Sequence, residues 1–520
     1  SSPDEADEIL EFETKMITRL SKDTDGLIPS VIPSTSGNSL VTHQDHQGCH
    51  HRLRILEFLP GTLLADINPR SNVLLTNLGE RMAELGSVLG AYPDHPPPRI
   101  HFDWALGEAG NIMEQSLSVL DGPQRALIKI TLRAFLENER EFLGLGSQII
   151  HGDVNDHNVL VSLNSEGLNY ISGIIDLGDA HSAPRVFDLA IAIAYGIFGT
   201  TDPLLAASEI TRGYYTVQPL LDIEIDVLMT LVCARLGQIV CIASRQRNQG
   251  VPDPYRLISE IGAWEALSLL ADIPQRLATG TLREACGLEA CPRSAPLRKW
   301  FEGQRFEEVV SLPEDPKALG VLDLSVSSPN LTGRDSNNTA TFTDRVFKRM
   351  RSDGLTLGIG RFLEPRGFYL TDAFEGRPGD PRERRTIHLG IDLFEQPGKA
   401  IHAPLAGHVH SVRDNDARLD YGPTVILEHH APSGPFWTLY GHLQRTSVEN
   451  LTAGDPVEAG QTIARIGPYP ENGDWPPHLH FQIITDLMGF EGEFPGVALP
   501  RDRGVWASFS PDPNLILNLP

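Results

Sequence analysis

The chain has 520 residues, a formal net charge of −25 and 41% hydrophobic residues. This length predicts about two or three domains with a sizeable core. The negative charge argues against nucleic acid or an anionic membrane as a partner, because both favour a basic surface. The five cysteines form no disulfide framework, and we interpret them as free or buried thiols.

Two features favour a cytoplasmic protein. The first residues are acidic and lack the apolar core of a signal peptide. The longest apolar run, Leu189 to Phe198, is too short and interrupted to span a bilayer. We therefore expect a protein of the cytoplasm, where ATP is available.

Helical and strand patterns share the first 150 residues. Residues 4–20 carry apolar side chains at helical spacing and predict an amphipathic helix. Residues 28–41 predict two strands joined by a turn, and residues 52–59 predict a strand that runs into a Pro-Gly turn. Further helices are expected over 71–90 and 111–143.

The first pattern that indicates chemistry lies at residues 149–161. A β-branched pair precedes a polar turn, and an apolar run that fits a buried strand follows it. Asp153 and Asn158 lie in that turn, and a second apolar strand ends at Asp176. The bland interpretation is that all three are ordinary turn residues. Their order along two apolar strands favours a functional one.

These three residue types are what phosphoryl transfer needs. One carboxylate orients the attacking hydroxyl, while an amide and a second carboxylate hold magnesium on the ATP phosphates. Asp153 is the candidate for the first role, and Asn158 and Asp176 are the candidates for the second.

The loop from His151 to Asn158 resembles the catalytic loop of the aminoglycoside phosphotransferase and choline kinase superfamily. The triplet Asp176-Leu177-Gly178 resembles its metal-binding triplet, and the surrounding strings are similar to the hydroxylysine kinase branch. The resemblance covers about residues 5 to 290. It implies a kinase-like fold that uses magnesium and ATP to phosphorylate a small amino alcohol.

The resemblance assigns further roles. Glu13 would pair with a strand lysine and help to hold ATP, although a solvated helix glutamate is an equally good interpretation. Asp188 would brace the catalytic loop. Asp179 would contact the amine of the substrate or the metal, with a plain turn residue as the alternative.

The small lobe departs from the family pattern. Gly26 is the first glycine, and only Lys15 and Lys22 are early lysines, so neither a Gly-rich loop nor a strand lysine precedes the first helix. We expect an incomplete small lobe, either because the chain is a fragment of a longer protein or because the lobe is degenerate. Domain 1–290 would then be mostly the helical large lobe.

Composition changes after that domain. Residues 291–345 are rich in Pro, Ser, Asn, Thr and Gly, which predicts a linker with little core of its own. Residues 346–520 show short strands separated by Gly, Pro and Asp, which predicts an all-β domain with a C-terminal tail. The overall fold class is therefore multidomain α+β.

Three histidine-bearing stretches mark this second domain. His388 and Asp392 would share one side of a strand, and His478 and His480 would share another, because side chains alternate along strands. Imidazole and carboxylate are the ligands of a catalytic zinc, which uses three protein ligands and keeps one position open. Spare histidines then act as general acid or base. A packed strand histidine is the alternative for any one of them.

The order of these stretches resembles the LytM and lysostaphin-type zinc metalloendopeptidases over about residues 350 to 500. The resemblance implies that His388, Asp392 and His480 bind zinc. It implies that His442 and His478 form the catalytic pair, acting on a peptide or another amide.

The two resemblances together predict a two-domain enzyme, an amino-alcohol kinase fused to a zinc hydrolase. The alternative is a non-catalytic protein that binds a metabolite and uses zinc only for stability. The joint architecture resembles bacterial fusions with a class III, pyridoxal-phosphate-dependent aminotransferase, so a longer chain would carry that domain after Pro520.

Overall fold

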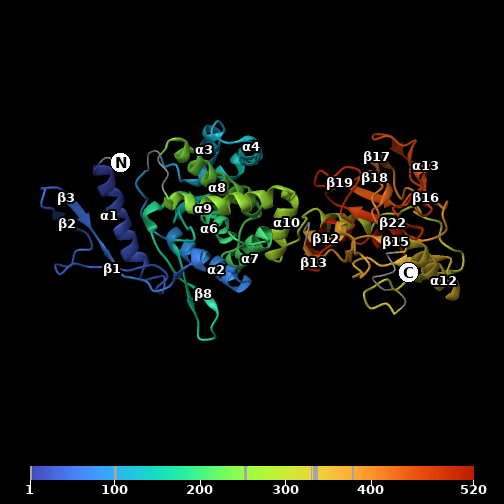
Figure 1. Ribbon diagram of the computed structural model, residues 1–520, viewed down its shortest axis with the longest axis horizontal. Helices are drawn as coiled ribbons and strands as arrows, with labels where there is room; N and C mark the ends of the chain where they lie inside the picture. The colour runs from blue at the N-terminus through green and yellow to red at the C-terminus, as the bar shows by residue number, and fades with distance from the viewer. Residues whose placement is uncertain (1–2, 99–101, 251–253, 330, 332–337, 378–379) are drawn as a thin grey trace. The chain divides into compact units, whose positions relative to one another are not determined.

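A computed structural model gives the fold of residues 3–98, 102–250, 254–329, 331, 338–377 and 380–520. The chain divides into two compact units, Ser1–Leu288 and Glu289–Pro520 (Figure 1). Each unit has its own hydrophobic core. The two are therefore described separately.

The first unit is mainly helical. Its helices are α1 (Pro3–Leu20), α2 (Asn72–Gly90), α3 (Ala109–Ser116), α4 (Gly122–Glu137), α5 (Glu139–Leu143), α6 (Arg185–Gly196), α7 (Pro203–Val217), α8 (Asp222–Asn248), α9 (Pro254–Ala271) and α10 (Gln275–Ala285). Its strands are β1 (Val31–Ile32), β2 (Val41–Gln44), β3 (His50–Leu53), β4 (Ile55–Leu56), β5 (Thr62–Leu63), β6 (Ser147–Ile150), β7 (Val159–Leu163), β8 (Asn169–Ile174) and β9 (His181–Pro184).

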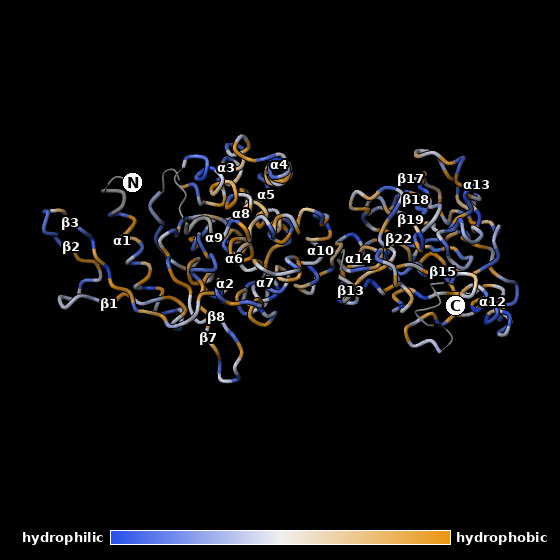
Figure 2. Tube along the Cα trace, viewed as in Figure 1, coloured by the Kyte–Doolittle hydropathy of each residue, from blue (hydrophilic) through white to orange (hydrophobic). Residues whose placement is uncertain are grey.

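Helix α8 is the central core element of this unit. It packs against α3, α4, α6, α9 and α10, and nearly every residue from Ile225 to Ser244 is buried. Helix α8 is long and apolar enough to cross a membrane. However, 89% of the residues in its most apolar 18-residue stretch are buried inside the fold. A helix that is apolar all round is typical of a core as well as of a membrane span. Figure 2 shows hydrophobic segments in the interior of this unit.

The small lobe consists of α1 and two short antiparallel ribbons. Strand β1 pairs with β4, and β2 pairs with β3. Helix α1 buries Met16, Ile17 and Leu20 in the core of the unit.

The polar loop of residues 149–161 is held between two pieces of sheet. Strand β6 pairs with β9, and β7 lies between β5 and β8 in a three-stranded antiparallel sheet. In this sheet Val159 faces Ile174 across the β7–β8 pair. The two chain ends that bear Asn158 and Asp176 therefore leave the sheet side by side.

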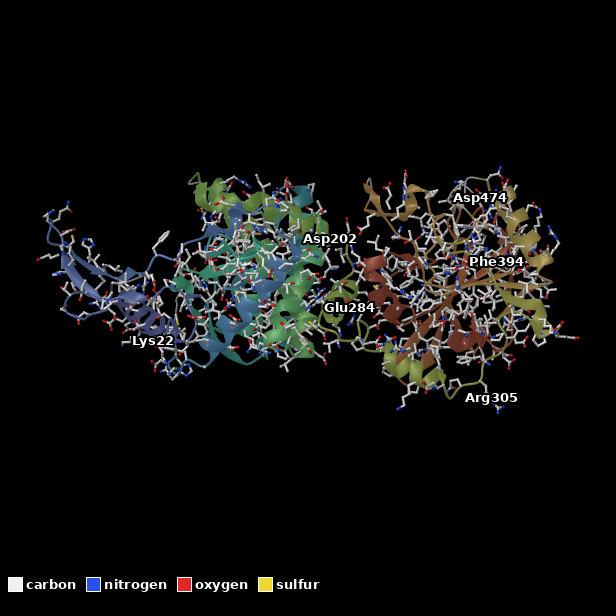
Figure 3. All side chains as sticks on the ribbon, turned by 90° about the horizontal axis from the view of Figure 1, so that it is seen from below. Lys22, Asp202, Glu284, Arg305, Phe394 and Asp474 are labelled. Carbon is white, nitrogen blue, oxygen red and sulfur yellow. The ribbon has the colours of Figure 1, made fainter. Side chains whose placement is uncertain are left out.

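The second unit is built on an eight-stranded sheet in the order β10-β11-β15-β22-β19-β18-β17-β20. These strands are β10 (Leu319–Val321), β11 (Leu357–Gly360), β15 (Ile391–Phe394), β17 (Gly407–Asn415), β18 (Gly422–Ala431), β19 (Gly434–Gly441), β20 (Pro456–Val457) and β22 (His478–Ile484). Smaller pairs join β12 (Glu375–Arg377) to β13 (Asp380–Arg384), β14 (Ile387–His388) to β23 (Val497–Ala498), and β16 (Ala400–His402) to β21 (Thr462–Arg465). Phe394, labelled in Figure 3, lies among the side chains that fill this unit.

Short helices flank the strands, so this domain is strand-rich rather than purely β. They are α11 (Ser294–Phe301), α12 (Thr339–Ser352), α13 (Arg445–Val448), α14 (Arg503–Phe509) and α15 (Asn514–Leu517). Helix α12 buries Phe342, Val346 and Met350 in a core cluster with Phe368 and Trp475.

The segment predicted as a linker, residues 291–345, is instead part of the second unit. Leu297 and Phe301 of α11 are each 2% exposed in the main core, and β10 forms an edge of the large sheet. The prediction of little core was wrong because the apolar residues here stand singly between Pro, Ser and Asp. These apolar residues follow neither the helical nor the strand spacing that marks a buried element in a sequence. Only contacts with distant strands bury them.

Candidate active sites

Asp188 fixes the backbone of the first polar loop. Its carboxylate accepts hydrogen bonds from the amides of His151 and Gly152, at 2.7 and 2.8 Å. Gly152 has φ +83°, and a Cβ there would lie 2.5 Å from the carbonyl oxygen of Asp179. A glycine is therefore required for the turn. The bracing role predicted for Asp188 matches this geometry.

Asp153 stands at the end of this turn with its side chain 23% exposed. Its Oδ1 accepts from Arg235 at 2.9 Å, and its Oδ2 accepts from the side-chain amide of Asn155 at 2.8 Å. Asn158 donates its Nδ2 to the Asp153 carbonyl at 2.9 Å. Because Nδ2 is used this way, the amide oxygen of Asn158 remains for a metal.

Asp176 lies beside Asn158, as the predicted magnesium site requires. The amide of Ile175 donates to the Asn158 carbonyl at 2.9 Å, so Asp176 follows directly after that contact. Asp176 has φ +63° and is exposed, and its Oδ1 accepts from the amide of Gly178. A non-glycine residue in left-handed backbone is strained, and such strain concentrates at functional sites. Two oxygen donors on adjacent chain ends fit a hard cation such as magnesium.

Glu13 and Asp179 are the two remaining residues with predicted roles in the first unit. Glu13 is 7% exposed and pairs with Arg54 at 3.5 Å, so an arginine that follows the helix takes the place of the lysine expected before it. Asp179 ends a short 3-10 turn, Leu177–Asp179, against which α1 packs, and its carbonyl accepts from His181. Its role as a substrate contact stays a prediction.

Arg235 is a residue that sequence reasoning missed. Its side chain is fully buried on α8, donates to Asp153 and to the Trp104 carbonyl, and lies 4.8 Å from the Trp104 ring. A buried charge is costly unless it is paired, so this arginine holds the Asp153 carboxylate in place. The available signal was an arginine within an otherwise apolar helix.

The second site forms where three strands of the large sheet meet. Asp392 on β15 pairs directly with His480 on β22, and Phe394 pairs with His478. His442 follows the end of β19, whose Gly441 pairs with His480. His388 and Asp392 do not share one strand as predicted, because β14 ends at His388 and β15 begins at Ile391. The chain bends between them, and both side chains still converge.

The donor set fits zinc. The ligand atoms of His388, Asp392 and His480 lie within 4.8 Å of one another, and all three residues are buried. His388 Nδ1 lies 3.1 Å from the Arg361 carbonyl, and His480 Nε2 lies 3.0 Å from Gln482 Oε1. These bonds orient the rings so that His388 Nε2 and His480 Nδ1 both point to Asp392 Oδ1, each at 3.1 Å. Outer hydrogen bonds of this kind orient metal-binding histidines.

Gly390 lies between the candidate ligands His388 and Asp392, where the structure leaves no room for a side chain. A Cβ there would lie 2.5 Å from Cε1 of His480 and 2.9 Å from the carbonyl oxygen of Phe481. Any side chain at this position would push the His480 ring away from Asp392.

His442 and His478 stand beside the three ligands as a pair. Their ring centroids are 4.3 Å apart, and their Nδ1 atoms lie 2.9 and 2.6 Å from the carbonyls of Asn472 and Pro476. His478 Nε2 lies 3.7 Å from Asp392 Oδ1. Each ring thus keeps its Nε2 for the site. His442 has φ +66°, a second case of strained backbone at a functional position.

Burial lowers the pKa of three histidines of this site, His388, His442 and His478, and so favours their neutral form. Burial and the nearby Arg366 lower the pKa of His388 to about 4. Burial and repulsion from His478 hold the pKa of His442 well below its usual value, and burial lowers that of His478. For Asp392 burial favours the protonated form, but His388 and Arg366 outweigh it and hold its pKa well below the usual range. A carboxylate with neutral imidazoles is the state that binds zinc.

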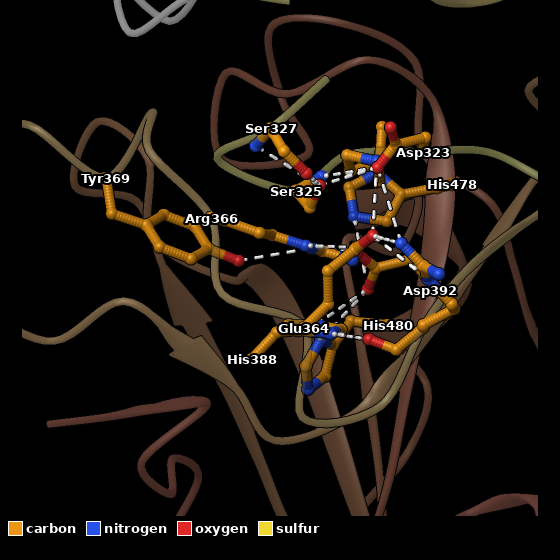
Figure 4. A network of polar contacts seen from close by, with 12 residues as sticks. Asp323, Ser325, Ser327, Glu364, Arg366, Tyr369, His388, Asp392, His478 and His480 are labelled. Atoms are coloured by element: carbon orange, nitrogen blue, oxygen red, sulfur yellow. Dashed lines mark hydrogen bonds and ion pairs between the residues drawn. The ribbon is translucent and has the colours of Figure 1, made fainter. Parts of the chain in front are cut away.

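A buried ion network supports the metal ligand Asp392 (Figure 4). Arg366 donates from Nη1 to Asp392 Oδ2 at 2.6 Å and to the Tyr369 hydroxyl at 3.1 Å, and from Nε to Glu364 at 3.1 Å. Glu364 and Arg366 are 3% and 2% exposed. Because Arg366 occupies Oδ2, only Oδ1 of Asp392 is left for a metal. Sequence reasoning missed this pair, since a Glu-Pro-Arg turn carries no motif.

Replacing Arg366 with Met is expected to lower the free energy of unfolding of the second unit by about 3–5 kcal/mol, because Asp392 would lose its buried guanidinium partner and Glu364 would keep only the half-exposed Arg361. Adding Glu364→Gln should recover part of this loss. Urea unfolding measures both effects. Arg361→Met is the matched control, since Arg361 pairs with the same Glu364 but is 50% exposed, and we expect it to cost less than about 1 kcal/mol. A single Arg366 variant as stable as the control would contradict this prediction.

Acid is expected to destabilise the zinc-free second unit. Burial lowers the pKa of His388 and of His429 to about 4. Between about pH 6.5 and 4 the unfolded chain therefore binds more protons than the folded one, and the free energy of unfolding falls as pH falls. Each histidine contributes roughly 3 kcal/mol over that window. Unfolding by urea across this range tests it, and His429→Gln should flatten the slope, whereas an unchanged slope would count against it.

Comparisons with known proteins match a different family to each unit. Residues 1–219 match the model of the phosphotransferase enzyme family, and residues 386–489 match that of peptidase family M23. The chain thus joins a segment similar to the phosphotransferase enzyme family to a segment similar to peptidase family M23. Both resemblances and the α+β fold class predicted from the sequence are confirmed.

The particular relatives of the first domain are hydroxylysine kinases. That of Mus musculus is 31% identical over 235 residues, 43% of this chain and 62% of the relative. The hydroxylysine kinase of Danio rerio is 32% identical over 197 residues, which are 37% of this chain and 55% of the relative. The chain thus spans about three fifths of these relatives' length. For the second domain, the solved catalytic domain of the prophage-encoded M23 protein EnpA from Enterococcus faecalis is 25% identical, with a TM-score of 0.17, covering 23% of this chain and 81% of that chain.

Proposed function

We propose that the first unit transfers the γ-phosphate of ATP to the hydroxyl of a small, hydroxylysine-like amino alcohol, and that the second hydrolyses an amide or peptide bond with zinc. The observation that carries the proposal is that each unit gathers its own chemistry-bearing residues at one place. The proposal places the chain in the cytoplasm. The aminotransferase domain expected in a longer chain stays a prediction.

In the kinase reaction the protein mainly positions groups. Magnesium-ATP supplies the phosphoryl group and the cation that offsets its charge. Asn158 and Asp176 offer the oxygens that hold the cation. Arg235 and Asn155 fix the carboxylate of Asp153, which accepts the proton of the acceptor hydroxyl as the new bond to phosphorus forms.

In the hydrolytic reaction His388, Asp392 and His480 hold the metal. Bound zinc would polarise the amide carbonyl and lower the pKa of a water ligand. His442 and His478 are neutral and aim Nε2 at the site, so one accepts the proton of the attacking water. The histidine that has taken this proton then carries it on Nε2 and returns it to the leaving amine.

The decisive experiment for the kinase uses the full chain with γ-labelled ATP, magnesium and a panel of acceptors that includes hydroxylysine and ethanolamine. Transfer to hydroxylysine supports the proposal. Transfer only to ethanolamine would correct the acceptor. No transfer to any acceptor would oppose the kinase half and leave the zinc site as the candidate catalyst of this chain.

A further inference from the structure

Aromatic rings border the catalytic histidine pair. Trp475 lies 6.1 Å from His442 and 6.4 Å from His478, centroid to centroid. Phe368 and Tyr369 lie 6.1 and 6.0 Å from Trp475. The series continues through ring contacts to Phe342 at 5.2 Å from Phe368 and to Phe374 at 4.7 Å from Tyr369. We call these five residues the aromatic wall: Phe342, Phe368, Tyr369, Phe374 and Trp475.

The aromatic wall and the zinc ligands line one cavity of about 370 Å³. That volume lies within the usual range for small-molecule sites. The lining also includes His388, His480 and both members of the histidine pair. A substrate whose amide reaches the metal site must therefore place its neighbouring groups against aromatic side chains.

The charged lining residues are already engaged. Glu493 pairs with Arg413 at 3.0 Å, and Asp420 accepts from the amide of Tyr421 at 2.7 Å. Arg385 donates to the Ala373 carbonyl. Burial raises the pKa of Asp420, so its charged form, which would attract a cationic ligand, is less favoured. The cavity thus offers an apolar surface beside carboxylates that already have partners, and two guanidinium nitrogens, Arg366 Nη2 and Arg385 Nε, for which the described residues provide no hydrogen-bond partner.

We propose that this site hydrolyses amides flanked by a bulky apolar side chain, preferably an aromatic one, rather than amides between glycines or alanines. The inference rests on the proposed zinc-hydrolase function and names its substrate class. The five rings of the aromatic wall are each only 2–7% exposed, so the cavity beside them is the space that a ligand can fill. A glycine beside the scissile bond would leave that space unfilled. An aromatic side chain that enters it would itself be removed from water, which raises affinity by about 10- to 100-fold.

The first experiment measures binding without turnover. Zinc-loaded full chain is titrated with acetohydroxamic acid and with 3-phenylpropanohydroxamic acid, which carry the same metal-binding group. We expect the phenyl compound to bind about 10- to 100-fold more tightly. Equal affinities would overturn the inference. Failure of the chain to bind zinc would overturn both it and the proposed hydrolysis.

Variants then locate the binding surface. Trp475→Leu and Phe368→Leu each remove a ring from the aromatic wall, whereas Phe436→Leu removes a buried ring from the other core cluster of the unit. The first two should reduce the preference for the phenyl compound by about tenfold, with zinc content unchanged. The Phe436 control should retain the preference. Loss of preference in the control alone would place the pocket elsewhere.

The second experiment measures cleavage. Zinc-loaded chain is incubated with two peptide mixtures that differ only in having Phe or Gly on both sides of one amide, and products are identified by mass spectrometry. Cleavage of the Phe set alone supports the inference, and cleavage of the Gly set alone overturns it. If neither set is cleaved while the phenyl hydroxamate is preferred, hydrolysis fails as a function and the apolar ligand class stands.

Discussion

The Asp153→Asn variant should lose phosphoryl transfer by about 10²–10⁴-fold, with little change in the KM for ATP. The amide keeps the size of the side chain but cannot accept the proton of the acceptor hydroxyl, and general base catalysis contributes about that factor. Initial rates of label transfer from γ-labelled ATP measure the effect.

A loss of fold must be separated from a loss of chemistry. Asp153 is the ion-pair partner of the fully buried Arg235, so its replacement also lowers stability. Thermal unfolding of both proteins, and assay at a temperature where both are folded, separate the two effects. Asp121→Asn is the control, because Asp121 only caps helix α4 and Asn caps equally well. Full transfer by the Asp153 variant would remove this residue from the mechanism.

Removal of a metal ligand should have the second large effect. The His480→Ala variant is expected to lose more than about 100-fold in zinc affinity, because even residues that only orient ligands change metal affinity by 10–100-fold. Hydrolysis should fall below detection. Zinc content after dialysis and amide cleavage measure the two losses, and 1,10-phenanthroline should reproduce the second in the unaltered chain.

Two controls sharpen this result. His410→Ala changes a strand histidine outside the site, whose Nδ1 contacts Ser411, and should keep full zinc content. Phosphoryl transfer by His480→Ala should be unchanged, because the kinase residues belong to a separate compact unit. A variant that retains one zinc per chain would contradict the ligand assignment.

Sequence motifs predicted most of the candidate residues of both sites, but not all of their partners. His388, Asp392 and His480 converge as the sequence indicated, although His388 lies on a strand of its own. Asn158 and Asp176 likewise lie at adjacent ends of the paired strands β7 and β8, and Asn158 donates to the carbonyl of Asp153. Glu13 was predicted to pair with a strand lysine, and the structure pairs it with Arg54. Short motifs were sufficient here because the chemistry restricts both the residue types and their order.

The supporting residues were not predictable in the same way. Arg235 lies 82 positions from Asp153, and Arg366 lies 26 positions from Asp392. No spacing rule joins such residues, because α8 and the β-strands are brought to the sites only by packing. The same holds for the apolar side chains of residues 291–345, which had the composition of a linker and form part of a core.

The sequence by itself determined the two family resemblances, their order along the chain and most of the residues that we propose for the two reactions. These follow from local motifs, in which a turn or strand fixes side chains a few positions apart. Only the tertiary structure decided the ion pairs that hold Asp153 and Asp392, and the aromatic wall beside the histidine pair. Burial by distant segments creates these features, since a charge or ring acquires its partners only when the core closes around it.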